Sequence, residues 1–362
     1  MITARDVLRR DVHALIERLA DGSRDDRARD ALLTSLAEIQ AATVPAYARL
    51  IAARGRDPYP AMPTDVFRFA RVAWHPAADD VRVFRTSGTT HGERGAHPFR
   101  DLETYDRAAE AAARHALFPD VARIDMAIVA PDEREAPDSS LAYMLARFGE
   151  WFASNVVQVW HSGGVDIDRA LRALRAAEST GKPLAIVGTT LALLHLDEAL
   201  EDTRFRLPAR SRIMQTGGFK TPTGPIPSED VRTRLAARFG IPDAGIIAEY
   251  GMTELSSQLY ERTLIDRMRG RITQRRTYWY PGWVRVTAVD PESLRPLPEG
   301  ETGLLRFDDV ANVDSVVAVQ TADVGRVEGE YVELLGRAPG AVQRGCSLAA
   351  AEALGRQGTE RP

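Results

Sequence analysis

Residues 122–130, ARIDMAIVA, decide the fold of this chain, because such an apolar run predicts a buried strand. Comparable runs follow at 155–160, 184–187, 211–215 and 245–250. A helix capped by Asp101 is expected to precede the first strand. Amphipathic segments predict helices between the strands, near 139–153, 166–179, 191–202 and 228–239. Strands alternating with helices in this way predict an α/β fold with a mostly parallel sheet covered by helices.

The pattern differs on both sides of this region. Before it, three helices are expected near 3–20, 24–41 and 44–54. After residue 270, short strands are expected at 283–289, 303–307, 315–320 and around Gly329, followed by a short helix near 347–356. We therefore expect a helical start plus an α/β body at 1–270, a smaller β-rich subdomain at 271–336 and a C-terminal tail at 337–362.

Composition excludes several classes of protein. The chain has 362 residues, of which 44% are hydrophobic and 27% charged, as in globular proteins. A formal net charge of −4 argues against a nucleic-acid partner. The charged start lacks the apolar stretch of a signal peptide, and no segment approaches the ~20 apolar residues of a membrane span. A single cysteine permits no intrachain disulfide. We expect a cytoplasmic enzyme without stable membrane insertion.

The segment 84–95, FRTSGTTHGERG, is a candidate phosphate-binding loop. Its glycines allow successive backbone N–H groups to face an anion, and its hydroxyls add donors without bulk. Arg94 can contact phosphate oxygens with a charge that does not titrate away. The candidate donors are Thr86, Ser87, Gly88, Thr89 and Thr90. An ordinary solvated turn accounts for the same residues taken alone.

Two further motifs follow predicted strands. Gln215–Lys220, QTGGFK, contains Gly217 and Gly218, and paired glycines let a flat ring approach the backbone at the carboxyl end of a strand. A tight turn explains them equally well. Residues 249–254 read EYGMTE, and Glu254 offers the carboxylate oxygen that a hard cation such as Mg²⁺ prefers. Taken alone, Glu254 is also explained as a helix-start carboxylate.

The lone cysteine, Cys346, stands in the segment RGCSL before the expected short helix. A helix N-terminus and the neighbouring Arg344 both favour its thiolate, which is the nucleophilic form. A small buried structural residue is the alternative.

In their order, these motifs resemble those of the adenylate-forming superfamily of acyl-CoA synthetases, adenylation domains and luciferases. Thr86–Thr90 matches the start of T-S-G-T-T-G-x-P-K-G, with His91, Glu93 and Arg94 departing from it. Residues 250–254 match Y-G-x-T-E, 321–325 (TADVG) resemble T-G-D-x-G, and Leu335–Arg337 resembles the G-R pair before the superfamily's hinge.

The resemblance implies a role for each matching residue. Gly217 and Gly218 line the adenine site, on which Tyr250 packs beside Gly251. Thr253 contacts the α-phosphate, Glu254 binds Mg²⁺, Asp323 holds the ribose hydroxyls, and Arg337 belongs to the hinge pair. The chain stops 25 residues after Arg337. We therefore expect it to lack the superfamily's mobile domain with its lysine.

With a cysteine near its end, the chain resembles one family more closely, the acyl-protein synthetase (LuxE-type) family. The HPFRD segment (His97–Asp101) and the RGCSL tail are similar to segments of that family. The resemblance implies that ATP and Mg²⁺ activate a carboxylic acid, a fatty acid in that family, as acyl-AMP. It further implies that Cys346 accepts the acyl group and passes it to a partner reductase. Two alternatives stay open: a ligase passing the acyl group to CoA or an amine, and a non-catalytic nucleotide-binding subunit.

Overall fold

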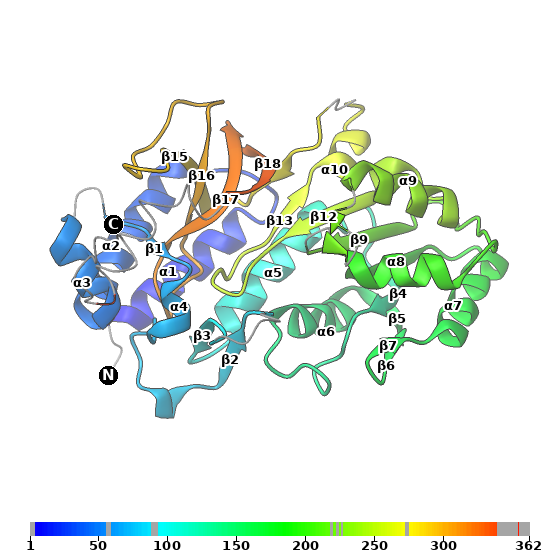
Figure 1. Ribbon diagram of the computed structural model, residues 1–362, viewed down its shortest axis with the longest axis horizontal. Coiled ribbons are helices and arrows are strands. Elements are labelled where there is room, and N and C mark those ends of the chain that lie inside the picture. Colours follow the sequence, from blue (N-terminus) through cyan, green and yellow to red (C-terminus); the bar gives the residue numbers. More distant parts are fainter. Residues whose placement is uncertain are drawn as a thin grey trace. The chain divides into compact units, whose positions relative to one another are not determined.

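The computed structural model describes residues 4–55, 59–87, 93–217, 220–221, 224–225, 227–271, 275–338 and 354 (Figure 1). Backbone contacts divide the chain into two compact units. Unit 1 comprises Met1–Ala112, Met252–Leu259 and Thr277–Pro362, and unit 2 comprises Ala113–Gly251 and Tyr260–Arg276.

Unit 2 contains the predicted parallel sheet. Its strands run in the order β12-β9-β8-β4-β5 and are all parallel to their neighbours. Their bounds are β4 (Ile124–Val129), β5 (Ala153–Gln158), β8 (Leu184–Thr189), β9 (Arg212–Thr216) and β12 (Ile246–Tyr250). The intervening helices are α6 (Ser140–Phe152), α7 (Ile167–Thr180), α8 (Thr190–Ala199) and α9 (Ser228–Phe239). The α/β class predicted from the sequence is confirmed.

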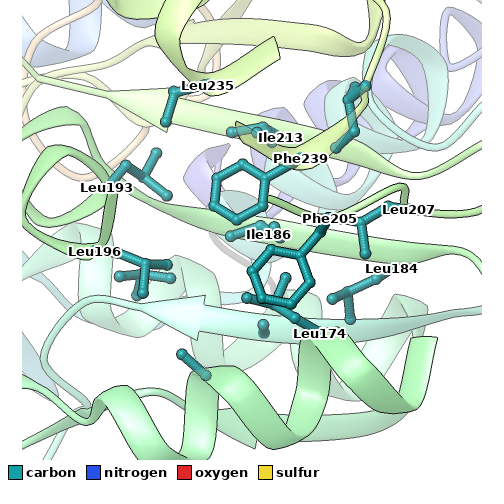
Figure 2. Close-up of a cluster of buried hydrophobic side chains, with 14 of the residues drawn as sticks. Leu174, Leu184, Ile186, Leu193, Leu196, Phe205, Leu207, Ile213, Leu235 and Phe239 are labelled. Carbon is teal, nitrogen blue, oxygen red and sulfur yellow. The ribbon is translucent and has the colours of Figure 1, made fainter. Parts of the chain in front are cut away.

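A hydrophobic cluster holds α7, α8 and α9 against this sheet (Figure 2). Leu174 of α7, Leu193 of α8 and Phe239 of α9 meet strand residues such as Ile186 and Ile213, and all five are buried. Strand residues that are apolar on both faces are what a sheet covered by helices requires.

Local signals set the ends of these helices. Asp166 begins α7 by accepting a hydrogen bond from the Arg169 backbone N–H at 3.0 Å. Gly181 ends the same helix in the left-handed conformation, with φ of 69°. Gly240, at φ 65°, ends α9 in the same way.

Unit 2 also contains shorter elements that the sequence did not predict. They are β6 (Trp160–His161), β7 (Gly164–Val165), β10 (Lys220–Thr221), β11 (Gly224–Pro225), the 3₁₀ turn η2 (Asp243–Gly245) and α10 (Thr263–Met268). Strand β13 (Leu259–Glu261) runs across the sequence boundary of the units.

Unit 1 contains the expected three helices and the antiparallel strands. The helices are α1 (Ala4–Arg18), α2 (Asp26–Thr43) and α3 (Pro45–Arg54). The strands are β14 (Tyr278–Trp279), β15 (Val284–Val289), β16 (Thr302–Asp309), β17 (Ala318–Glu328) and β18 (Tyr331–Arg337), in the order β15-β16-β17-β18-β14. Strand β1 (Met62–Pro63) adds to β17 in parallel. The remaining elements are α4 (Val66–Phe69), η1 (Ala77–Asp79), β2 (Arg82–Arg85), β3 (Ala96–Phe99) and α5 (Glu103–Ala116), which begins here.

The compact units divide the chain elsewhere than the expected domains at 1–270, 271–336 and 337–362. One reason lies in α2, where the buried Gln40 donates to the Asn312 carbonyl at 3.0 Å and accepts from the Val317 N–H at 2.8 Å. These bonds tie the helical start to the β-rich strands. The expected helix at 347–356 falls outside the described residues, apart from the helical Leu354.

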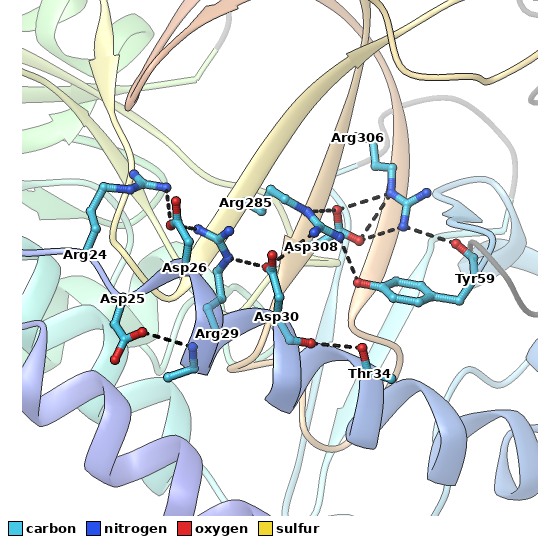
Figure 3. A network of polar contacts seen from close by, with 11 residues as sticks. Arg24, Asp25, Asp26, Arg29, Asp30, Thr34, Tyr59, Arg285, Arg306 and Asp308 are labelled. Carbon is cyan, nitrogen blue, oxygen red and sulfur yellow. Dashed lines mark hydrogen bonds and ion pairs between the residues drawn. The ribbon is translucent and has the colours of Figure 1, made fainter.

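An ion-pair network centred on the buried Asp308 also joins a helix and strands of unit 1 (Figure 3). Asp308, 1% exposed, accepts from Arg285 at 3.2 Å and from Arg306 at 2.8 Å. Burial alone would raise the pKa of Asp308, but these two guanidinium groups hold it below its ordinary value. Arg285 also reaches Asp30 of α2 at 3.2 Å, so the network extends from strand to helix.

Candidate active site

The candidate phosphate loop is the turn of a β-hairpin. Strands β2 and β3 pair antiparallel with Arg85 opposite Ala96, so residues 86–95 connect them. The Thr86 N–H donates to the Gly95 carbonyl at 3.0 Å, and the Gly95 N–H donates to Thr86 Oγ1 at 2.9 Å. The helix expected after Asp101 is α5, and strand β3 lies between the loop and this helix.

Within this loop, Ser87 is exposed, whereas Gly88, Thr89 and Thr90 lie outside the described residues. Arg94 donates from Nε to the Thr86 carbonyl at 2.5 Å and from Nη2 to the Arg85 carbonyl at 3.2 Å. These bonds hold the base of the hairpin loop. The predicted contact of Arg94 with phosphate therefore stays a prediction.

Glu254 lies beside the base of the loop, within unit 1. A Cβ added at Gly95 would stand 3.0 Å from Thr86 Cγ2 and 3.5 Å from Glu254 Oε1. The first distance is tight and the second is an ordinary van der Waals contact, so glycine at position 95 leaves room for Thr86, and Glu254 lies on the same side. The Glu254 side chain is buried, in a region where two of the predicted motifs meet.

Burial raises the pKa of Glu254 to about 7, although its own backbone N–H and Arg337 act to lower it. Asp65 and Asp323 add to the rise. Asp323 and Arg337 are cross-strand partners in β17 and β18, after a bulge that shifts the register between Val324 and Gly325. The fold thus brings Thr86, Glu254, Asp323 and Arg337 together from distant positions in the sequence.

Thr253 also belongs to unit 1, whereas the four residues predicted for the adenine site belong to unit 2. Gly217 follows β9 with a φ of 89° and is exposed, and Gly218 lies outside the described residues. Tyr250 is the last residue of β12, the parallel neighbour of β9, and the exposed Gly251 follows it. Gly217 and Tyr250 therefore share the carboxyl edge of the sheet, where open α/β sheets bind ligands.

Three polar residues near the motifs were missed from the sequence. Glu249 stands opposite Thr216 in register and accepts a hydrogen bond from its hydroxyl, while burial raises the Glu249 pKa to about 7. His97 contacts the Thr253 carbonyl, and Asn312 donates to the Glu254 carbonyl. His97 lies in HPFRD and Glu249 precedes Tyr250, so proximity to the motifs was the available signal; Asn312 offered none.

Glu254 is the predicted ligand of Mg²⁺, and Cys346 is the predicted nucleophile. No group of three His, Cys, Asp or Glu side chains that could hold a metal occurs in the part of the chain that the structure describes. Glu254 fits Mg²⁺ as one protein carboxylate supplemented by nucleotide phosphates, which is how this cation is often held. Cys346 lies outside the described residues. No described helix is long and apolar enough to cross a membrane.

Solved structures with a similar fold are adenylate-forming ligases. A 2-hydroxyisobutyryl-CoA ligase, solved with its acyl-AMP and CoA, superposes with a TM-score of 0.62 at 14% identity, over 86% of this chain and 74% of the ligase. ATP-bound MatB from Rhodopseudomonas palustris gives a TM-score of 0.50 at 20% identity, over 74% and 50% of the two chains.

Sequence comparison identifies the family. A long-chain-fatty-acid–luciferin-component ligase of Aliivibrio fischeri is 22% identical over 315 residues, covering 82% of this chain and 79% of the relative. The Vibrio harveyi protein of the same name is 34% identical over 81 residues, covering 20% and 21%. The family model described as acyl-protein synthetase, LuxE, matches residues 48–355. Because that match includes every residue predicted for the site, from Thr86 to Cys346, the chain belongs to the acyl-protein synthetase (LuxE) family of acid ligases.

Proposed function

We propose that this protein uses ATP to activate a fatty acid as acyl-AMP, transfers the acyl group to Cys346 and passes it to a reductase partner. The observation that carries the proposal is the family match over residues 48–355, which spans the phosphate loop, the Tyr250–Glu254 motif and the cysteine. The ligases named among the relatives act on long-chain fatty acids, which supports the substrate class.

In the first half-reaction, a carboxylate oxygen attacks the α-phosphorus of ATP, and the bond to pyrophosphate breaks. Thr86–Thr90 and Arg94 surround the phosphates, and Thr253 contacts the α-phosphate. Asp323 holds the ribose, and Gly217, Gly218, Tyr250 and Gly251 form the adenine site. Glu254 together with the phosphates would hold Mg²⁺, which would offset the negative charge of the phosphates.

The environment of Glu254 supports this role. Burial raises the pKa of Glu254 to about 7, because it makes the charged carboxylate unfavourable. A bound cation would stabilise the charged form. Arg337 supplies part of the compensating charge, since it acts to lower the same pKa. A divalent cation would supply the remainder and convert the group fully to its charged form.

In the second half-reaction, the Cys346 thiolate attacks the acyl carbon of acyl-AMP. The bond between the acyl carbon and the phosphate oxygen breaks, AMP leaves, and a thioester remains on the enzyme. The thioester is then available to a reductase.

Pyrophosphate exchange tests the first half-reaction, and mass spectrometry tests the second. Fatty acids of several chain lengths should support ATP–pyrophosphate exchange and leave an acyl adduct on Cys346. Cys346→Ser should keep the exchange and lose the adduct. Exchange absent with every acid, despite ATP binding, would indicate a non-catalytic subunit. Acyl transfer from Cys346→Ser to CoA or an amine would exclude the thioester step.

A further inference from the structure

The Thr253–Glu254 segment is a turn held by side chains. Met252 accepts a backbone hydrogen bond from Leu255 at 3.2 Å, so Thr253 and Glu254 are the central residues of the turn. No helix or strand includes residues 251–258. The two central carbonyls therefore depend on donors from elsewhere in the chain.

Two buried side chains provide those donors. His97, fully buried on β3, bonds through Nδ1 to the Thr253 carbonyl at 2.7 Å. Asn312, 1% exposed, donates from Nδ2 to the Glu254 carbonyl at 3.0 Å. Asn312 also accepts the Ser256 N–H at 2.8 Å, so one amide bonds to the backbone on both sides of Leu255.

These two bonds act on the two peptide planes that flank the Glu254 Cα. The Thr253 carbonyl belongs to the plane before it, and the Glu254 carbonyl belongs to the plane after it. Fixing both planes fixes φ and ψ of Glu254, and these angles set the direction of its Cα–Cβ bond. We propose that His97 and Asn312 are positioning residues that aim the Glu254 carboxylate and the Thr253 side chain at the nucleotide phosphates. This inference rests on the proposed function.

The chemistry of His97 suits this task. A carbonyl only accepts, so Nδ1 must carry the proton. Burial lowers the pKa of His97 to about 4, which keeps the ring neutral and leaves Nε2 unprotonated. Nε2 has no hydrogen-bond partner among the described residues. The ring is held by Phe99, whose centroid lies 4.3 Å away, and by Phe67 at 5.9 Å.

Asn312 is itself anchored from the N-terminal helices. Gln40 of α2 donates to the Asn312 carbonyl, and the Asn312 amide also donates to Val316 at 3.1 Å. The turn is thus held through a chain of buried polar groups that leads away from the nucleotide site. Such networks fix a single geometry when their members are paired.

Three variants separate positioning from general stability. His97→Leu removes the donor at similar volume, and His97→Asn keeps an N–H close to the position of Nδ1. Tyr47→Phe is the matched control, because it deletes a part-buried hydroxyl-to-carbonyl bond from α3 to Pro60 (3.1 Å). The readouts are the rate of acid-dependent pyrophosphate exchange at saturating ATP and the Mg²⁺ concentration for half-maximal exchange.

His97→Leu should lower the exchange rate by about tenfold or more and raise the Mg²⁺ requirement, because loss of one buried hydrogen bond has that size of effect on a transition state. His97→Asn should stay within about threefold of the parent, and Tyr47→Phe should change neither quantity. Equal rates for His97→Leu and His97→Asn would overturn the positioning role, as would an equal loss in Tyr47→Phe.

A second measurement uses the parent protein and therefore does not depend on whether His97→Leu folds. Nitrogen chemical shifts of the histidine rings in the folded parent protein should show His97 protonated at Nδ1 and unprotonated at Nε2, the signal being assigned with His97→Asn. The opposite tautomer would overturn the inference. Failure of the parent to exchange pyrophosphate would instead overturn the proposed function, while the tautomer still tests the backbone contact itself.

Discussion

Replacement of Glu254 by glutamine should stabilise the ligand-free protein at alkaline pH. The pKa of Glu254 is raised from 4.5 to about 7, chiefly by burial. The folded state therefore binds the proton more tightly than the unfolded state, and the stability due to this group is lost as the pH rises from 4.5 through 7. Linkage puts the cost of the charged form at about 3 kcal/mol near pH 8 and under about 1 kcal/mol near pH 5.

Glutamine is neutral at both pH values and keeps an oxygen for the backbone N–H that Glu254 accepts. Urea denaturation without Mg²⁺ or ATP should show Glu254→Gln more stable than the parent by about 1–3 kcal/mol near pH 8, with the difference shrinking near pH 5. Glu301→Gln, at an exposed position, is the control and should show no such trend. A variant less stable than the parent near pH 8 would refute the reasoning, since Arg337 would then outweigh burial. The same variant should lose pyrophosphate exchange.

Further substitutions test other parts of the structure. Asp308→Asn should destabilise the protein by about 3–5 kcal/mol in chemical denaturation, because Arg285 and Arg306 lose their buried counter-ion; a change below about 1 kcal/mol would contradict the network. Gly188→Ala places a Cβ 2.3 Å from the Val129 carbonyl and should cost about 1–3 kcal/mol, whereas Gly164→Ala, with open space around it, should be nearly neutral. Asp323→Asn should raise the KM for ATP in the exchange assay more than it lowers the rate at saturation; an unchanged KM would argue against its contact with ribose.

Much of the fold followed from the sequence because the relevant signals are local. The strand at 122–130 appears as β4, Ile124–Val129, and the helix expected at 228–239 has those bounds. Apolar strands with helices between them leave few arrangements other than a parallel sheet. Short elements such as β3 and β10 escaped prediction, since two to four residues carry too little periodicity.

The site was predictable as a set of motifs but not as a geometry. Thr86 and Glu254 were recognised by their motifs, yet their approach at Gly95 depends on how a hairpin packs in three dimensions. The role of Asn312 depends on a contact 58 residues away in the chain, for which no local pattern exists. The role of Asn312 can be identified only from the fold, because asparagine is common in loops and its presence alone indicates no function.

The bulge between β17 and β18 has a consequence for Arg337. Gly325 faces Leu334 while Val324 faces Gly336, so Leu335 is the extra residue that opposes nothing. Side chains alternate between the faces of a sheet, and a one-residue slip turns every later side chain to the other face. In a regular ladder, with Leu335 opposite Val324, Asp323 would stand opposite Gly336, and the arginine would leave the face where its charge reaches Glu254. The unpaired Leu335 thus determines which face of the sheet Arg337 occupies, and with it the effect of the Arg337 charge on the buried Glu254.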